Sequence, residues 1–158
     1  MIRRSTLVIG FALSGCATLA PPEERQVQFI ENVSASKAEA FSRALAYFGK
    51  AFGDAHKAIK VQNADAGQIV AKGNYPCSIF RQTGDFSNYS VHFDLDFQAK
   101  DKRIRLAFED MRMVDGNSDP VAWDYGQIDS REKAARVGRE CLVSLKSSLL
   151  KAIDGGNW

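Results

Sequence analysis

The chain has 158 residues, of which 45% are hydrophobic and 25% are charged, as is typical of a globular protein. Its 21 Lys and Arg and 19 Asp and Glu give a formal net charge of +2. We expect Arg3 and Arg4 to be removed with an N-terminal signal, which leaves 19 basic and 19 acidic residues in the mature chain. This balance excludes the basic footprint of a nucleic-acid binder.

The N-terminal segment has the pattern of a secretion signal. The two arginines precede an apolar run at residues 7–13, which is too short to cross a bilayer because a spanning helix takes about 20 residues. The run ends in Leu-Ser-Gly-Cys at residues 13–16, which resembles the lipobox of bacterial lipoproteins. The resemblance implies cleavage before Cys16 and lipid attachment to its sulfur, with several acyl chains as a firm anchor. The alternative is an ordinary signal cut after Ala20, which would release a soluble protein.

The lipobox resemblance also implies a compartment. Retention of a lipoprotein in the inner membrane usually requires Asp after the lipidated cysteine, whereas this chain has Ala17. We therefore expect an outer-membrane anchor with the domain in the periplasm. Residues 1–15 would be the signal, 16–24 the lipidated N-terminus and a short, stiff tether, 25–154 a single domain, and 155–158 a frayed tail.

A strand and a helix open the predicted domain. Residues 26–33 alternate loosely, which indicates a strand. Ser36 and Glu39 have the spacing of a capping box, which marks a helix start. Apolar side chains then recur on one helical face, at Phe41, Leu45, Phe48 and Phe52. We expect a helix over residues 36–52, stopped by Gly53.

Beyond this helix the hydrophobic period changes to two, which predicts antiparallel strands. Residues 59–61 belong to the first strand and residues 64–67 form a turn. The next strand covers residues 68–75, and we expect Pro76 to end it because proline cannot donate to a sheet ladder. Residues 77–88 are predicted to be a longer connection.

The clearest strand covers residues 89–99, where apolar and polar residues alternate strictly. Such alternation indicates that one face is buried and the other is in water. Residues 100–103 turn the chain, and the buried face resumes over residues 104–108. The pattern then slips, which predicts a bulge near Glu109-Asp110.

A second amphipathic helix closes the domain. Asp129-Ser130 with Glu132 can cap it, and Gly155-Gly156 ends it. Its apolar face comprises Ala134, Val137, Cys141, Leu145, Leu149 and Ile153. The order is therefore strand, helix, four strands, helix. Only the two helices can cover the apolar face of the sheet, so we predict a two-layer α+β domain, helix-grip-like in outline, with its polar sheet face towards solvent.

Three stretches carry a resemblance to a known family. They are IKV at residues 59–61, GQIVAKG at residues 67–73 and RIRL at residues 103–106, and the opening helix carries the resemblance as well. With these, the chain resembles the bacterial envelope domain of unknown function that has a TBP-like fold, over about residues 25–115. The resemblance implies the fold alone, because the family has no established functional residues. A neutral periplasmic domain is not expected to share the DNA binding of the TATA-binding protein.

Cys77 and Cys141 remain once Cys16 is assigned to the anchor. An oxidising periplasm permits a disulfide between them, which would link a loop to the final helix. Two separate buried thiols are the alternative, because free cysteines are common core residues. The position of Cys141 on an apolar helix face is typical of an unreactive thiol.

His92, Asp94 and Asp96 share the polar face of the clearest strand. An imidazole and two carboxylates can bind a divalent metal, but neighbours in this set are about 7 Å apart along a strand. Arg103 and Arg105 on the next strand would compete for the carboxylates, so cross-strand ion pairs explain the pattern better. We find no catalytic or cofactor motif, and we expect no metal, no cofactor and no enzyme activity.

Apolar residues in two predicted loops complete the candidates. Phe80 and Phe86 lie in one loop, and Trp123 and Tyr125 lie in the other. These side chains either form a binding surface for a protein, peptidoglycan or an amphiphile, or they close the core beneath the sheet edge.

Three functional hypotheses follow. The leading one is a lipid-anchored, non-catalytic module that binds an envelope protein or assists envelope assembly. The second is a carrier of a small apolar ligand, which requires a cavity behind Phe93, Leu95, Phe97 and Leu145. The third is a metal-dependent enzyme centred on His92, which requires ligands that converge in a cleft.

Overall fold

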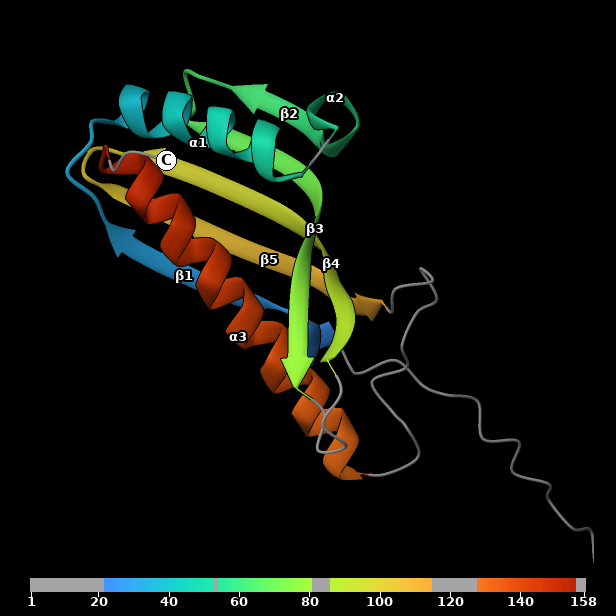
Figure 1. Cartoon of the computed structure of the whole chain (residues 1–158). Helices are drawn as coiled ribbons and strands as arrows, with labels where there is room; N and C mark the ends of the chain where they lie inside the picture. Colours follow the sequence, from blue (N-terminus) through green and yellow to red (C-terminus); the bar gives the residue numbers. More distant parts are fainter. Residues whose placement is uncertain (1–21, 53, 81–85, 115–127, 156–158) are drawn as a thin grey trace, which may run out of the picture.

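Five antiparallel strands form one sheet, and two long helices cover one of its faces (Figure 1). The computed structural model describes residues 22–52, 54–80, 86–114 and 128–155. The strand order is β1-β5-β4-β3-β2, which confirms the predicted α+β domain and its order of strands and long helices. The elements are η1 (Pro22–Arg25), β1 (Val27–Asn32), α1 (Lys37–Ala51), α2 (Ala55–Ala58), β2 (Ile59–Asn63), β3 (Gln68–Phe80), β4 (Phe86–Lys100), β5 (Arg103–Val114) and α3 (Ile128–Ile153).

The start of α1 is fixed by the predicted capping box. The Ser36 backbone N–H donates to Glu39 Oε2 at 3.0 Å, and the Glu39 N–H donates to Ser36 Oγ at 3.4 Å. The Ser36 hydroxyl also donates to Glu39 Oε2, at 2.8 Å, and the hydrogen bonds from this hydroxyl and from the Ser36 N–H lower the pKa of the Glu39 carboxyl. The Lys37 N–H, another free donor of the first turn, donates to Asp101 Oδ1 at 3.2 Å. Because Asp101 lies in the β4–β5 turn, this contact ties the helix to the sheet.

The turn between β2 and β3 requires a glycine. Gly67 has a φ of +69°, and its carbonyl accepts a hydrogen bond from the Ala99 N–H at 2.8 Å. A Cβ at Gly67 would lie 2.5 Å from the carbonyl oxygen of Ala99. The predicted turn is therefore confirmed, and the glycine lets β3 approach the end of β4 closely.

The β3–β4 hairpin is longer than the sequence predicted. β3 continues through Pro76 to Phe80, and Phe80 pairs directly with Phe86 on β4. The prediction that Pro76 ends the strand is therefore wrong, as is the loop predicted at residues 77–80 and 86–88, which belong to the two strands. Residues 81–85 lie outside the described part of the chain. The physical reason is that β2 pairs only with residues 68–71 of β3, so that Pro76 lies on an edge, where a missing N–H is tolerated.

The predicted bulge lies in β5 opposite Phe93. Asp94 pairs with Glu109, whereas His92 pairs with Arg112, so that two β5 residues oppose one β4 residue. Asp110, the first of the two, has a φ of +46°. The bulge shifts the buried phase of the strand by one residue, since Phe108 and Met111, the second bulge residue, are both fully buried although they lie three positions apart.

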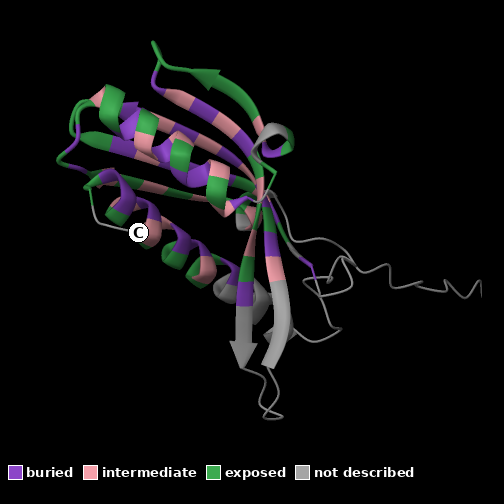
Figure 2. Cartoon of the chain, turned by 45° about the horizontal axis from the view of Figure 1, so that its top comes forward, coloured by how far each residue is buried: buried purple, intermediate pink, exposed green. Residues whose placement is uncertain are grey.

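The buried residues lie between the sheet and the two helices (Figure 2). The Phe48 ring of α1 stacks on Phe52 at 5.2 Å and meets Phe97 of β4 edge-on at 5.8 Å. Phe93 contacts Phe108 edge-on at 5.0 Å. α3 buries Leu142, Leu145, Leu149, Ala152 and Ile153, whereas Cys141 is only partly buried. The buried face of α3 therefore includes Leu142, which lies beside the predicted stripe through Cys141 and Leu145.

A short helix leads into the sheet. This helix is η1 at residues 22–25, and the Arg25 side chain pairs with Asp110 at the β5 bulge. Within the described part of the chain, none of the helices combines the length and the hydrophobicity needed to span a bilayer.

Candidate functional site

The uncovered face of the sheet carries a hydrogen-bonded network centred on Asp96. Its carboxylate accepts from Gln68 Nε2 at 2.9 Å and from Gln98 Nε2 at 3.4 Å, and it pairs with the Arg105 guanidinium. Arg105 Nη1 also donates to Gln28 Oε1 at 3.3 Å. The network therefore links four neighbouring strands, β1, β5, β4 and β3, across the polar face.

The other carboxylate of the predicted trio is paired as well. Asp94 accepts two hydrogen bonds from Lys72 Nζ, at 2.7 and 2.9 Å. The predicted cross-strand ion pairing therefore involves Lys72 and Arg105, while Arg103 lies at the β4–β5 turn opposite Lys100. Among the described residues, no group of three or more His, Cys, Asp or Glu side chains is placed to hold a metal ion.

A hollow of about 250 Å³ lies at the edge of β3, beside α2. Phe52 and Ala58 line it on the helix side of the sheet, and His92 lines it on the open side. Its remaining lining residues are Asp54, Lys57, Lys72, Gly73 and Asn74. Because side chains from both faces line it, the hollow wraps around the strand edge.

Gly73 shapes this hollow from beneath. A Cβ at Gly73 would lie 2.7 Å from the Phe93 ring and 3.0 Å from the Phe52 ring. The two rings therefore occupy the space that a side chain would take, and Phe52 meets Phe93 edge-on at 5.8 Å. The glycine lets the aromatic core reach the strand edge, where Phe52 becomes part of the hollow.

His92 is placed to make stability depend on pH. Burial lowers the pKa of its imidazole from the usual 6.5. The unfolded chain then binds the proton at a higher pH than the folded chain does, so that folding is weakened as the pH falls through 6.5. We expect His92→Gln to remove this part of the pH dependence. Urea unfolding at pH 7.5 and 5.5 should show a smaller loss of stability in the variant, and equal losses would contradict the assignment.

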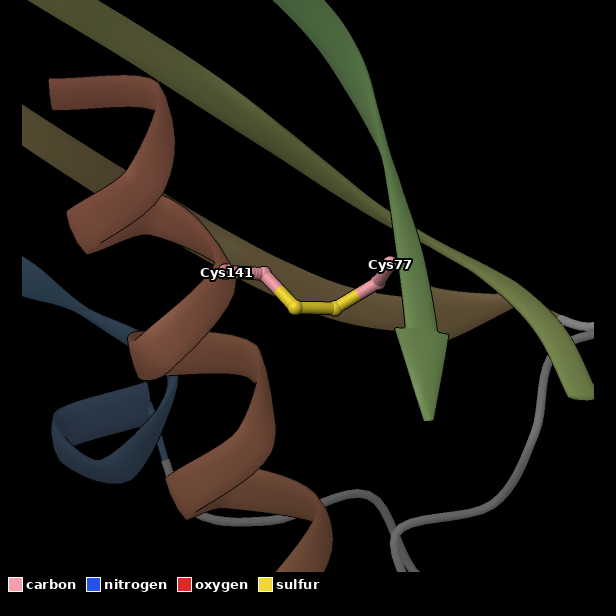
Figure 3. Close-up of a disulfide and its surroundings, with 2 residues drawn as sticks. All are labelled: Cys77 and Cys141. Carbon is pink, nitrogen blue, oxygen red and sulfur yellow. A yellow bond between two sulfur atoms is a disulfide. The ribbon is translucent and has the colours of Figure 1, made fainter. Parts of the chain in front are cut away.

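Cys77 of β3 and Cys141 of α3 are joined in the structure by a disulfide (Figure 3). Their Cα atoms are 5.8 Å apart, within the range that a bridge requires. Cys77 lies on a strand rather than on the predicted loop, so the bridge fastens the sheet directly to the covering helix. The bridge therefore links α3 to the part of β3 that does not pair with β2.

The remaining predicted residues fall in different places. Cys16, Trp123 and Tyr125 lie outside the described residues, as do Gly53 and residues 156–158. Phe80 and Phe86 are paired in the backbone ladder of β3 and β4, so they are strand residues and not members of a loop. His56 belongs to α2, the short helix beside the hollow. The sequence did not predict this helix.

The region proposed for an apolar ligand is occupied by side chains. Phe93, Leu95, Phe97 and Leu145 are each at most 3% exposed. Phe97 and Phe93 contact Phe48 and Phe108 edge-on, respectively, in the same layer. This packing favours a solid core over a carrier cavity.

The fold places the protein in a structural class. A five-stranded antiparallel sheet with two helices on one face is a TBP-like fold. It is similar to the crystal structure of a TBP-like protein from Parabacteroides distasonis ATCC 8503, with a TM-score of 0.62 and 13% identity over 84% of this chain and 94% of that one. It is also similar to a DUF4468 family protein from Bacteroides ovatus ATCC 8483, with a TM-score of 0.56 and 9% identity over 87% and 92% of the two chains.

The family is defined by sequence as well. Residues 27–113 match the domain of unknown function (DUF4468) with TBP-like fold, and the chain belongs to this family. No curated protein matches the sequence. The match covers the sheet from β1 to β5 and includes the residues of the β3 edge.

The hollow cannot be predicted from local sequence patterns because its lining residues come from separate elements. Two local signals pointed to it. Gly73 interrupts an otherwise well-formed strand, and Pro76 follows three residues later. Both are typical of a strand edge or of a close approach to the backbone.

Proposed function

We propose that the protein is a lipid-anchored periplasmic module that binds another envelope component and has no catalytic activity. The observation that carries this proposal is the Leu-Ser-Gly-Cys sequence at residues 13–16, at the end of a short apolar run. Acylation of Cys16 would hold the domain at a membrane, and Ala17 favours the outer membrane by resemblance to other lipoproteins.

The position of the domain start supports a close tether. Five residues separate Cys16 from Pro22, the first residue of η1, so a tether of six residue steps spans at most about 20 Å. The Arg25–Asp110 ion pair fixes the chain at the β5 bulge. An anchored domain would therefore stay close to the bilayer, with the β4–β5 turn at the opposite end of the sheet.

The chemistry of the sheet supports binding rather than catalysis. Asp94 and Asp96 form ion pairs with Lys72 and Arg105, which is the arrangement of a cross-strand structural network on a solvent-facing sheet. Positive and negative side chains alternate on this face, which does not resemble the basic surface that binds nucleic acid. The filled core likewise favours a surface site over an internal ligand site.

The anchor is tested by changing the sulfur that would carry it. We expect Cys16→Ser to lose lipid and to move from the membrane fraction to the soluble periplasmic fraction, or to remain unprocessed. Metabolic labelling with a fatty acid and fractionation of cells would measure both effects. Ser14→Ala, which keeps a small residue before the cysteine, should behave as the parent does. Labelled, membrane-bound Cys16→Ser would contradict the proposal.

The expected membrane can be tested separately. Ala17→Asp should shift the anchored protein from the outer to the inner membrane on density-gradient fractionation, because Asp at that position resembles a retention signal. Ala17→Ser is the matched control and should stay in the outer membrane. If both variants behave alike, the outer-membrane assignment fails while the anchor stands.

A further inference from the structure

β1 forms one edge of the sheet and is paired on one side only. Its residues, Val27–Asn32, run antiparallel to β5 in an unbroken register. Among the described strands, none lies on the outer side of β1 (Figure 1). A strand edge of this kind exposes unpaired N–H and C=O groups, which are a template for another extended chain.

A hydrogen bond just after the strand shows which backbone groups of β1 point outward. The Val33 N–H donates to the Lys102 carbonyl at 3.0 Å, which continues the register of β1 and β5. Residues that exchange hydrogen bonds alternate along an antiparallel pair with residues that do not. The odd-numbered residues of β1 therefore bond to β5, whereas the backbone groups of Gln28, Ile30 and Asn32 point away from the sheet. Each of these three residues offers both an N–H and a C=O to a partner.

The two edges of the sheet differ in how they are protected. β2, at the other edge, contains Lys60, and its register shifts between Ile59 and Val61. A lysine and a bulge are means by which natural proteins keep edge strands from pairing with other chains. β1 has no lysine, no proline and no bulge. Its one charged residue, Glu31, is already paired with Lys146 of α3 at 2.6 Å, so the edge of β1 is suited to pairing.

Exposed apolar side chains flank this edge on both faces of the sheet. Ile30 is 58% exposed and lies on the uncovered face, opposite Arg105. Val143 of α3 is 43% exposed. Lys146 lies three residues further along the same flank of α3 and reaches Glu31, so Val143 lies on the side of the helix that faces this edge. A partner at β1 would remove apolar surface from water on both faces, which favours association.

We infer that the edge of β1 binds the same edge of a second copy of the chain, so that two sheets form one continuous sheet across a two-fold axis. The two strands run antiparallel, and Ile30 faces Ile30 of the partner subunit. Gln28 then faces Asn32 of the partner subunit, and the reverse pair forms on the other side of the axis. Every outward N–H and C=O group of β1 is paired in this register, which gives about six hydrogen bonds.

The sequence of β1 suits pairing with itself. In this register the two exposed Ile30 side chains meet on the uncovered face, and the side-chain amides of Gln28 and Asn32 lie opposite each other, where they can hydrogen-bond. Glu31 lies opposite Phe29 of the partner subunit, so like charges do not face each other. A two-fold axis at Glu31 would set two carboxylates opposite each other, and one at Phe29 would leave Asn32 without a partner in the strand.

The covering helix leaves room for this arrangement. α3 makes its main contacts with the sheet at β3 and β5, which lie inside the edge. A helix above β5 would be separated from its counterpart by three strand spacings, about 14 Å. Helices that pack directly are only about 8–10 Å apart. The two helices therefore do not clash, and side chains such as Val143 can fill the space between them.

A cysteine at the proposed centre tests the arrangement. In the inferred pair, the Cα atoms of the two residues at position 30 are about 5.5 Å apart, within the range of a disulfide. We expect Ile30→Cys, as purified full-length protein in detergent, to form a disulfide-linked dimer under mild oxidation.

Asn32→Cys is the matched control, because Asn32 is exposed on the same strand and the same face. It faces Gln28 of the partner subunit rather than its own counterpart, so its two cysteines would be about 14 Å apart and should stay unlinked. The dimer yield on a non-reducing gel would be compared at several protein concentrations. Failure of Ile30→Cys to exceed Asn32→Cys would overturn the inference.

Charges at the same position give a second, reversible test. Ile30→Lys and Ile30→Glu each set like charges opposite each other, and each should raise the dimer Kd about tenfold or more in sedimentation equilibrium. A mixture of the two variants should restore the dimer, because opposite charges then face each other. Val61→Lys adds the same charge to an exposed apolar residue at the other edge, and it should dimerise as the parent does.

Three results would contradict the pairing. They are a parent chain that stays monomeric at every concentration, a mixture of Ile30→Lys and Ile30→Glu that stays monomeric, and an equal effect of Val61→Lys and Ile30→Lys. Neither assay depends on lipid at Cys16, so the dimer and the anchor can fail independently. A monomeric protein whose Cys16→Ser variant leaves the membrane would overturn the dimer alone.

Discussion

Phe48→Ala is expected to lower the free energy of unfolding by about 3–5 kcal/mol. Phe48 belongs to α1, and its side chain is fully buried between this helix and the sheet. Its ring stacks on Phe52 and meets Tyr47 and Phe97 edge-on, so it joins the helix to the middle of the sheet. Alanine would remove these contacts and leave a cavity that a close-packed core fills only in part. Urea unfolding followed by circular dichroism would measure the loss.

Two further variants control for this effect. Val61→Ala removes apolar atoms from a side chain that is 44% exposed, and it should change stability by no more than about 0.5 kcal/mol. Phe48→Leu keeps most of the buried volume and should cost less than Phe48→Ala. If Phe48→Ala were as mild as Val61→Ala, the packing of α1 on β4 would be wrong.

Loss of the Cys77–Cys141 bridge is expected to cost about 4 kcal/mol, the loop-entropy value for its sequence separation of 64 residues. The bridge joins β3 to α3, two elements that the chain forms far apart. Without the bridge, the unfolded chain gains conformational entropy, and the C-terminal half of β3 loses its covalent link to α3. The double variant Cys77→Ala and Cys141→Ala should therefore unfold at a clearly lower urea concentration.

Reductant distinguishes the bridge from the loss of two side chains. Dithiothreitol should lower the stability of the unaltered protein towards that of the double variant and leave the variant itself unchanged. A free-thiol assay on denatured, unreduced protein should find neither Cys77 nor Cys141. Two free thiols, together with no effect of reductant, would show that the native protein holds separate cysteines.

Local patterns in the sequence account for most of the secondary structure. The capping box at Ser36 and Glu39 set the start of α1 because both partners lie within one helical turn. Strict alternation of polar and apolar residues predicted β4, because a strand with one solvent-exposed face can be recognised from neighbouring residues in the sequence alone. The slip after Phe108 predicted the bulge for the same reason. The strand end predicted at Pro76 was wrong because the effect of a proline on a strand depends on whether a neighbouring strand is present on its N–H side.

The candidate site was less accessible to prediction. His92 and Asp94 were identified as polar face residues, yet the partner of Asp94 proved to be Lys72, 22 residues earlier in the chain. Nothing local to Gly73 indicates that Phe52 and α2 lie beside it. The aromatic residues at 80 and 86 were assigned to a loop because the length of a hairpin depends on cross-strand pairing.

The sequence by itself determined the likeness to lipoproteins, the amphipathic helices and the wet and dry faces of the strands. These features arise from residues a few positions apart, where periodicity and turn chemistry act directly. Only the tertiary structure decided that β2 stops short of Pro76, that α2 lies beside β3 and that Cys77 meets Cys141. Those features depend on contacts between distant segments, and the chain makes such contacts only when the whole core packs.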